Sequence, residues 1–309
     1  MKRVILSRLT GITGAGLFLT ALAGLIRGLE PFATWFYSFA WWSYIMMADA
    51  LIFQYQGSSL LMNRFRELPR LAVSSITCWL IFEAANLILG NWHYRGLPEP
   101  VPLRWLGYLL GFATVFPGLF QTKELLGLTG LLGQDRTTGK QTGTSWLAPC
   151  AILGVILLML PLQWPRYGFP FIWLAFIFLL EPFCFIGGGR SLWDDWAKGQ
   201  RRDIYLWMSA GMLCGFFWEC WNYWAKAKWI YTLPFFNRGR IFEMPILGYL
   251  GFAPFALECV VMYNFIRMLE EQYLSTAAAG RRWLFGQMIF WLLMFLAIDH
   301  WTVLAGVAG

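Results

Sequence analysis

Nine stretches of this chain are apolar and long enough to cross a lipid bilayer, and they constrain the fold more than any other feature. An α-helix needs about 17 to 25 such residues to span roughly 30 Å of hydrocarbon. Because the bilayer core offers the backbone no hydrogen-bond partners, these stretches are expected to be helical. We therefore predict an all-α, polytopic integral membrane protein with about nine transmembrane helices. The stretches lie near residues 9–27, 35–54, 70–90, 103–121, 146–163, 169–187, 203–223, 245–267 and 283–306.

The composition agrees with this class and excludes others. Of the 309 residues 58% are hydrophobic and only 13% are charged, which is too apolar for a soluble domain. The net charge of +7 is not gathered into a basic stripe, so no nucleic-acid partner is expected. The expected surroundings are instead the lipid bilayer.

The basic residues are divided unevenly between the two sets of loops. About two thirds of the 24 Lys and Arg fall on one side, among them Lys2, Arg3, Arg8, Arg136 and Lys140. The positive-inside rule then predicts a cytoplasmic N-terminus, an outer C-terminus and a location in the cytoplasmic membrane, as in a bacterial inner membrane. The smaller group comprises Arg27, Arg95, Arg104, Arg166, Lys226, Lys228, Arg238 and Arg240.

A pattern of polar and aromatic residues occurs twice in the chain. A Glu-x-x-Asn sequence near the end of one apolar stretch is followed by W-x-Y and then by another apolar stretch. Such internal similarity at a long period is typical of duplicated units. The first copy holds Glu83, Asn86, Trp92 and Tyr94, and the second holds Glu219, Asn222, Trp229 and Tyr231.

This duplication predicts four segments. Residues 1–122 form a first four-helix repeat, 123–145 a polar Gly/Thr-rich cytoplasmic linker, 146–268 a second four-helix repeat, and 283–306 an extra transmembrane helix. An even number of crossings per unit gives both copies the same orientation, so the repeat is parallel.

Three carboxyl groups within the apolar stretches are the candidate catalytic residues. Glu83 and Glu219 each share a helix face with the Asn three residues later, and such groups are costly in hydrocarbon unless they serve a function. The alternative is that they hydrogen-bond neighbouring helices together. Glu258 has no counterpart, since Gly118 occupies the matching place, and it either acts as an acid or binds a backbone carbonyl.

For other polar residues in the apolar stretches the sequence favours a structural role. Asp49 and Glu181 lie near helix ends, where we expect them to pair with Arg64, Arg66 or Arg190.

The chain contains only two histidines, His93 and His300. His300 follows Asp299, and the roles of these three residues stay open. Neither a metal nor a cofactor is expected, because no ligand-spacing motif occurs.

The duplicated pattern resembles the membrane lycopene cyclase domain and the related carotenoid hydratase-type proteins. The matching features are the two acids Glu83 and Glu219, the two W-x-Y pairs, and the opening FEMPILGYLGF at residues 242–252. That family has a Pro-Ile-Glu-Glu signature, whereas Pro245 here is followed by Ile-Leu-Gly. The resemblance implies protonation of a polyene by an acid, with the W-x-Y rings around the substrate.

The leading hypothesis is an integral membrane enzyme that uses acid–base chemistry on an apolar lipid or isoprenoid, with a cyclase-like or hydratase-like reaction. Asn86 and Asn222 would orient the carboxyl groups, and the Trp and Tyr rings of both W-x-Y pairs would bind the substrate. One alternative is a proton-coupled transporter. Another is a non-catalytic subunit that holds a lipid, pigment or quinone. The sequence does not define the oligomeric state.

Overall fold

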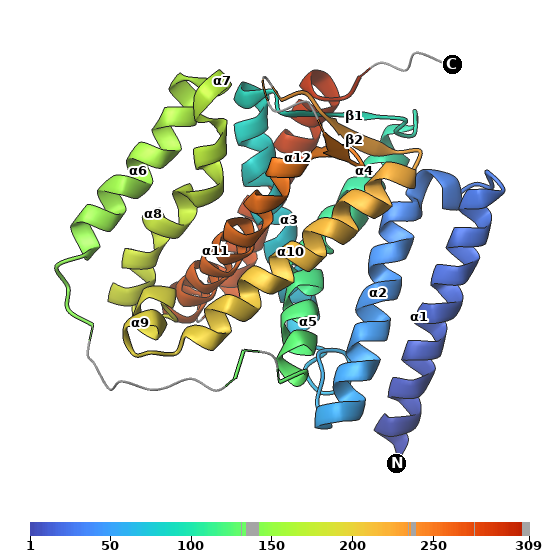
Figure 1. Cartoon of the computed structure of the whole chain (residues 1–309), viewed down its shortest axis with the longest axis horizontal. Coiled ribbons are helices and arrows are strands. Elements are labelled where there is room, and N and C mark those ends of the chain that lie inside the picture. Colours follow the sequence, from blue (N-terminus) through green and yellow to red (C-terminus); the bar gives the residue numbers. More distant parts are fainter. Residues whose placement is uncertain (131, 134–141, 234, 236–238, 275, 305–309) are drawn as a thin grey trace.

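The structure is a computed structural model of the chain (Figure 1). It describes residues 1–130, 132–133, 142–233, 235, 239–274 and 276–304. Much of the predicted linker therefore lies outside the described residues, with Arg136 and Lys140, and so do Arg238 and the end of the helix predicted at 283–306.

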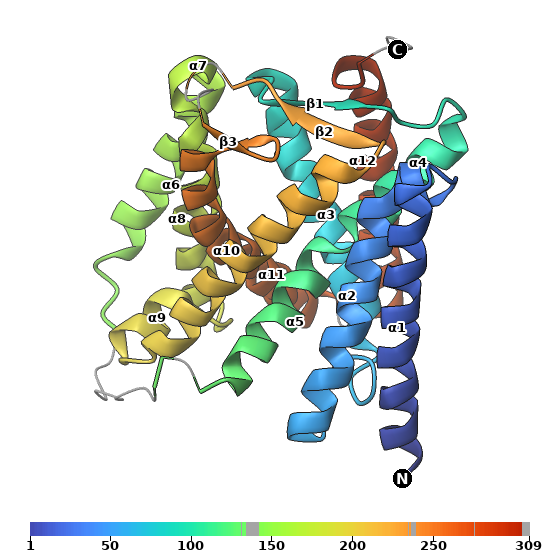
Figure 2. The same ribbon diagram turned by 45° about the vertical axis from the view of Figure 1, so that its right-hand side comes forward.

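Long helices run back and forth between two ends of the molecule (Figures 1 and 2). The chain starts at one end with α1, and the strands β1 and β2 lie at the opposite end, called the strand face below. The first half contains α1 (Lys2–Ile26), α2 (Phe32–Gln56), α3 (Glu67–Leu89), α4 (Val101–Phe112) and α5 (Val115–Leu128). The second half contains α6 (Leu147–Gln163), α7 (Pro165–Gly168), η1 (Phe169–Phe171), α8 (Ile172–Ile186), α9 (Leu192–Ala197), α10 (Arg201–Trp224), η2 (Ile246–Gly251), α11 (Phe252–Tyr273) and α12 (Ala277–Trp301).

Six segments of the described chain are helical, long and apolar enough to cross a membrane, which confirms a helical fold of the multi-pass type. They are Lys2–Ile26, Glu67–Leu89, Val101–Leu128, Pro165–Ile186, Ile246–Tyr273 and Ala277–Trp301. The other three predicted spans fall on α2, α6 and α10, of which α6 is a shorter apolar helix. The total of nine crossings stays a prediction.

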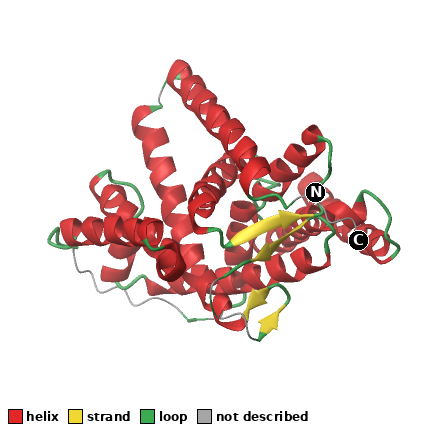
Figure 3. Cartoon of the chain, turned by 90° about the horizontal axis from the view of Figure 1, so that it is seen from above, coloured by secondary structure: helices red, strands yellow, loops and turns green. Residues whose placement is uncertain are grey.

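A short antiparallel ribbon closes the strand face (Figure 3). β1 (Trp92–Arg95) pairs with β2 (Lys228–Tyr231) so that Trp92 lies opposite Tyr231 and Tyr94 lies opposite Trp229. The chain after α12 adds to β1, because the Tyr94 N–H donates to the Thr302 carbonyl at 2.8 Å. A second, two-residue pairing joins β3 (Arg240–Ile241) to β4 (Met244–Pro245). The two W-x-Y segments, which are distant in sequence, thus meet directly.

The predicted span at 103–121 is broken into α4 and α5. Pro117 lacks an N–H and crowds the carbonyl four residues earlier, which interrupts the helical ladder around Ala113 and Thr114. The Ser75 hydroxyl from α3 bridges the break, since it donates to the Phe112 carbonyl at 2.5 Å and accepts from the Phe116 N–H at 3.1 Å. A side chain inserted into the ladder is a usual cause of a kink.

Two glycines let the start of α11 approach α10 closely. A Cβ at Gly215 would lie 2.2 Å from the Phe252 ring, and one at Gly211 would lie 2.2 Å from the Phe252 carbonyl oxygen. Side-chain atoms cannot come that near, so glycine is required at both positions for this packing. The contact fixes Phe252 beside the end of α10 that carries Glu219.

At the end of the bundle opposite the strands, two buried carboxylates each bind the turn after their own helix. Asp49 accepts hydrogen bonds from the Ser59 hydroxyl and the Leu61 N–H, both at 2.8 Å. Glu181 likewise accepts from the Ser191 hydroxyl at 2.6 Å and from the Leu192 N–H at 3.0 Å. The predicted pairing of these two acids with arginines is therefore wrong, because hydroxyl and backbone donors in the turns satisfy them first.

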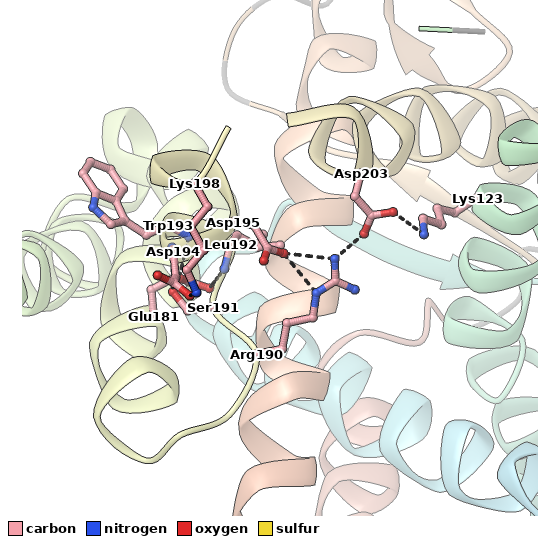
Figure 4. A network of polar contacts seen from close by, with 10 residues as sticks. All are labelled: Lys123, Glu181, Arg190, Ser191, Leu192, Trp193, Asp194, Asp195, Lys198 and Asp203. Carbon is pink, nitrogen blue, oxygen red and sulfur yellow. Dashed lines mark hydrogen bonds and ion pairs between the residues drawn. The ribbon is translucent and has the colours of Figure 1, made fainter. Parts of the chain in front are cut away.

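The arginines at this end bind other acids. Arg190 contacts Asp203 and, at 3.0 Å, Asp195, while Lys123 of α5 contacts the same Asp203 (Figure 4). Lys123 and Asp203 belong to different halves of the chain, so this network ties α5 to α10. Arg64 in turn binds Glu124 at 2.7 Å.

A smaller set of contacts holds the beginning of the second half. Asp194 accepts from the Lys198 ammonium at 2.5 Å and from the Thr142 hydroxyl at 2.6 Å. Partial burial raises the pKa of the Asp194 carboxyl, but these hydrogen bonds and the Lys198 charge outweigh it and hold the pKa below its usual value. The carboxylate therefore stays ionised at mildly acidic pH.

Candidate functional site

A cavity of about 360 Å³ lies beneath the strand face, between the two halves of the chain. Ligand pockets in proteins usually enclose roughly 300 to 1,000 Å³ and are lined mostly by apolar groups. This one is rich in aromatic rings drawn from α3, β1, α8, α10, β2 and α11. They include Trp79, Trp92, Trp173, Trp218, Trp229 and Phe255.

The rings on the cavity wall pack edge to face around Phe255. Its ring lies 5.5 Å from those of Trp173 and Trp218 at steep angles, and 6.2 Å from the ring of Trp79. Such arrangements are favoured by the ring quadrupole. The negative faces of these rings also attract cations, so the wall suits an apolar ligand or a positively charged form of it.

Both asparagines of the repeated pattern hold a strand. The Asn86 amide donates to the Trp92 carbonyl at 2.8 Å and accepts from the N–H groups of Asn91 and Trp92. The Asn222 amide makes the equivalent pair of bonds with the Trp229 carbonyl and N–H, both at 2.9 Å. Neither amide contacts a candidate carboxyl group or lines the cavity. Both amides thus anchor β1 and β2, and their predicted role in substrate binding stays a prediction.

Glu83 is enclosed by donors from its own half of the chain. Its Oε1 accepts from the indole N–H of Trp79 at 2.9 Å, from that of Trp92 at 3.1 Å and from the Tyr94 hydroxyl. Oε2 has no hydrogen-bond partner, and the residue is fully buried. All three donor residues line the cavity while Glu83 itself does not. It therefore lies behind the wall and holds three of its rings in place.

Glu219 is placed differently, because it lines the cavity. Its Oε1 accepts from the Tyr231 hydroxyl at 2.8 Å, and Tyr231 in turn accepts from the Trp229 indole at 3.0 Å. Its Oε2 has no hydrogen-bond partner among the described residues. One carboxyl oxygen is thus held in position and the other is available to a ligand.

Glu258 lies one helical turn beyond Phe255 on α11 and is fully buried. Its Oε1 accepts from the Phe176 backbone N–H at 2.8 Å. The observed backbone partner is thus an N–H group, whereas one of the two predictions from the sequence was a backbone carbonyl. It does not line the cavity. At Gly118, the matching place in the first half, a Cβ would lie 2.6 Å from the Trp41 ring, so no side chain fits there.

Two basic residues on the cavity wall are already paired with acids. Arg104 binds Asp299 through two hydrogen bonds of 2.7 Å, and Asp299 also accepts from Tyr108 at 2.8 Å. Lys228 binds Glu243 at 2.8 Å, with both side chains largely buried. The wall therefore offers an incoming anion no unpaired positive charge at these two positions.

The histidines lie at the strand face. The His93 ring contacts the Thr232 hydroxyl at 3.1 Å, and the His300 ring packs against Trp301. Among the described residues, no group of three or more His, Cys, Asp or Glu is placed to hold a metal ion.

Sequence reasoning did not single out Arg104, Trp218, Phe255 or Asn91 for the site. The pairing of Arg104 with Asp299 joins positions 195 residues apart, which no local pattern reveals. Trp218 immediately precedes Glu219, and Asn91 immediately precedes the first W-x-Y, so proximity to the repeated pattern was the available signal for both.

The chain matches no protein-family model, no curated protein and no solved structure. A chemical assignment consequently depends on the geometry of the cavity and on the residues around it.

Proposed function

We propose that this chain is an integral membrane enzyme that acts by acid–base chemistry on an apolar lipid or isoprenoid. The observation that carries the proposal is the carboxyl group of Glu219. It is buried, lines an aromatic cavity, is fixed through one oxygen by Tyr231 and has its other oxygen free. Buried carboxyls with a positioned neighbour are typical general acids and bases.

In this mechanism the protonated Glu219 transfers its proton from Oε2 to a carbon–carbon double bond of the substrate. The new C–H bond leaves a carbocation on the substrate and a carboxylate on Glu219. The Tyr231 hydroxyl stabilises the carboxylate, and the faces of the surrounding rings stabilise the cation. The Glu219 carboxylate then takes back a proton, either from a carbon adjacent to the cation or from a water that has added to it, which completes an isomerase-like or hydratase-like reaction.

The resemblance to the membrane lycopene cyclase and carotenoid hydratase-type proteins supports this class of reaction. Glu83 enters the proposal as a partner that holds the rings Trp79, Trp92 and Tyr94. Glu258, one turn behind Phe255, enters as a second acid next to the floor of the cavity.

The proposal includes a membrane topology of nine crossings, a cytoplasmic N-terminus and two parallel four-helix units. The alternating direction of the helices supports it (Figure 1). The two halves also contain similar contacts, which supports the repeat: Asn86 and Asn222 each bind a strand carbonyl, and Asp49 and Glu181 each accept from a serine hydroxyl. Labelling of single cysteines introduced near Met1 and Trp301 with a membrane-impermeant reagent tests the orientation. Reaction near Trp301 alone in intact cells is the expected result.

The enzymatic assignment is tested by identifying the lipids that co-purify with the protein in mild detergent and following their conversion. We expect Glu219→Gln to bind the same lipid and to lower its turnover at least 100-fold, which is the usual contribution of a general acid. Glu83→Gln serves as the matched control and should retain more activity. A folded Glu219→Gln protein that turns over every lipid at the wild-type rate would contradict the assignment.

A non-catalytic subunit that holds a lipid, pigment or quinone is the second candidate. The enclosure of Glu83 and Glu258 behind the wall favours it, since only one of the three carboxyls reaches the cavity among the described residues. Stoichiometric recovery of one unaltered lipid, with no product in any assay, would support this candidate.

A further inference from the structure

Asn91 is a polar residue in the cavity wall that the proposed proton transfer does not use. The residue is buried, with 2% of its surface exposed, and lines the cavity. Within the part of the chain that the structure describes, neither the amide nitrogen Nδ2 nor the amide oxygen Oδ1 has a hydrogen-bond partner. A buried amide without partners is costly, typically by more than its hydrogen bonds would contribute, and such groups in native proteins call for a ligand or another explanation.

The backbone of Asn91 is fixed from both sides. Its N–H donates to the Asn86 side chain at 2.8 Å, and its carbonyl accepts from the Thr232 N–H of the other half at 2.8 Å. Gly90 before it adopts φ +59°, a left-handed conformation that ends α3 and turns the chain into β1. The residue is therefore held at the cavity wall by a rigid backbone, as a preorganised binding group would be.

Two more polar atoms of residues on the same wall lack partners among the described residues. They are Oε2 of Glu219 and the indole N–H of Trp218, and both residues are buried. Together with the Asn91 amide they provide donors and an acceptor within an otherwise apolar and aromatic lining. A pure hydrocarbon would leave all of these groups unsatisfied.

The charges on the wall restrict the ligand further. The Arg104 and Lys228 side chains are each neutralised by an acid, Asp299 and Glu243 respectively. A phosphate or diphosphate needs unpaired basic donors, which these two residues do not provide. The polar groups of the ligand are expected to be neutral.

We infer that the cavity binds a lipid with one neutral oxygen-bearing group, a hydroxyl or carbonyl, and that Asn91 recognises this oxygen. The isoprenoid nature of its apolar body rests on the proposed function. The Asn91 amide donates to a carbonyl, or both donates to and accepts from a hydroxyl. Bare hydrocarbons and prenyl diphosphates are both poor ligands of such a wall.

Three probes that share one isoprenoid chain but differ in their end group separate neutral alcohols from diphosphates and bare hydrocarbons. The probes are geranylgeraniol, geranylgeranyl diphosphate and the hydrocarbon that carries a methyl group in place of the hydroxymethyl group. Dissociation constants are measured from the quenching of tryptophan fluorescence in lipid nanodiscs. We expect the alcohol to bind at least tenfold more tightly than either of the others, as loss of one buried hydrogen bond predicts.

Asn91→Leu is the decisive variant, because leucine has a similar size and no polar atoms. It should weaken binding of the alcohol about tenfold and abolish the preference over the hydrocarbon. Its melting temperature without ligand should equal or exceed that of the wild type, since two unpaired buried atoms are removed. Asn264→Leu is the matched control: the Asn264 amide nitrogen also lacks a partner, but the residue does not line the cavity, so binding should be unchanged.

Equal binding of hydrocarbon and alcohol, tightest binding of the diphosphate, no detectable binding of the alcohol, or an unchanged preference in Asn91→Leu would each overturn the inference. Its failure is distinguishable from that of the proposed function. Should Glu219→Gln retain full turnover while Asn91 selects the alcohol, only the function is refuted. Conversely, Glu219-dependent turnover of a bare hydrocarbon would refute the inference alone.

Discussion

Glu83 and Glu219 occupy the same place in the repeated pattern but have different surroundings. Glu83 receives three hydrogen bonds on one oxygen and lies behind the cavity wall. Glu219 receives one, from Tyr231, and lines the cavity. The same motif therefore produces a sealed carboxyl in the first half and an accessible one in the second.

One substitution and one changed hydrogen bond between the halves account for this difference. The residue four positions before Glu83 is Trp79, which donates to it, whereas the residue four positions before Glu219 is Gly215. Gly215 has no donor and instead admits the Phe252 ring. The second change is in the W-x-Y indole, since Trp92 donates directly to Glu83 but Trp229 donates to Tyr231.

The comparison is tested most strongly by replacing each glutamate with leucine. Glu83→Leu leaves three buried donors without an acceptor, so we expect a loss of about 3–5 kcal/mol in unfolding free energy, or no folded protein. Glu219→Leu leaves one such donor and should cost about 1–2 kcal/mol. Thermal unfolding in detergent, followed by tryptophan fluorescence, measures both. Equal losses would show that the two sites do not differ as the contacts imply.

A smaller difference is expected between the two asparagines that anchor the strands. Asn86 makes three hydrogen bonds to the backbone and Asn222 makes two. Asn86→Ala should therefore cost about 2–3 kcal/mol and Asn222→Ala about 1–2 kcal/mol. The same melting experiment applies, with Asn264→Ala as a control for loss of an asparagine elsewhere. A larger effect at Asn222 than at Asn86 would contradict this order.

The smallest effects concern the indole donors. Trp79→Phe removes one of three bonds to Glu83 and should cost about 1 kcal/mol with little change in lipid turnover. Trp229→Phe removes the bond to the Tyr231 hydroxyl, which itself donates to Glu219, so a similar cost should come with a several-fold loss of turnover. Melting temperature and initial rate, measured on the same samples, separate the two. If Trp79→Phe reduced the rate as much as Trp229→Phe, both carboxyls would have to be placed in the reaction.

The sequence predicts much of this fold, because hydropathy is a local property. Each of the nine apolar stretches contains a helix, including the stretches that hold Glu83, Glu219 and Glu258. The two W-x-Y segments were expected near a cavity and both line one. Hydropathy does not show where a helix breaks, and the interruption before Pro117 was not predicted.

The hydrogen-bond partners that the sequence did not predict share a physical cause. Sequence reasoning assigns a buried polar side chain to a partner of opposite charge or to a ligand, but backbone groups at helix ends compete for it. Asn86 and Asn222 bind the backbone of a strand, and Asp49 and Glu181 bind the backbone of the turn after their own helix. Such partners are invisible in a sequence because every residue except proline carries the same backbone N–H and C=O groups.

The hydrogen bonds between β1 and the chain after α12 impose an order on biosynthesis. Tyr94 receives its partners at Thr302 and Leu304 only from the last part of the described chain. The first W-x-Y segment must therefore wait, through the synthesis of about 200 further residues, until α12 and the residues that follow it have been made. Membrane insertion of the first half alone would leave Tyr94, and with it one hydrogen bond to Glu83, without its final support.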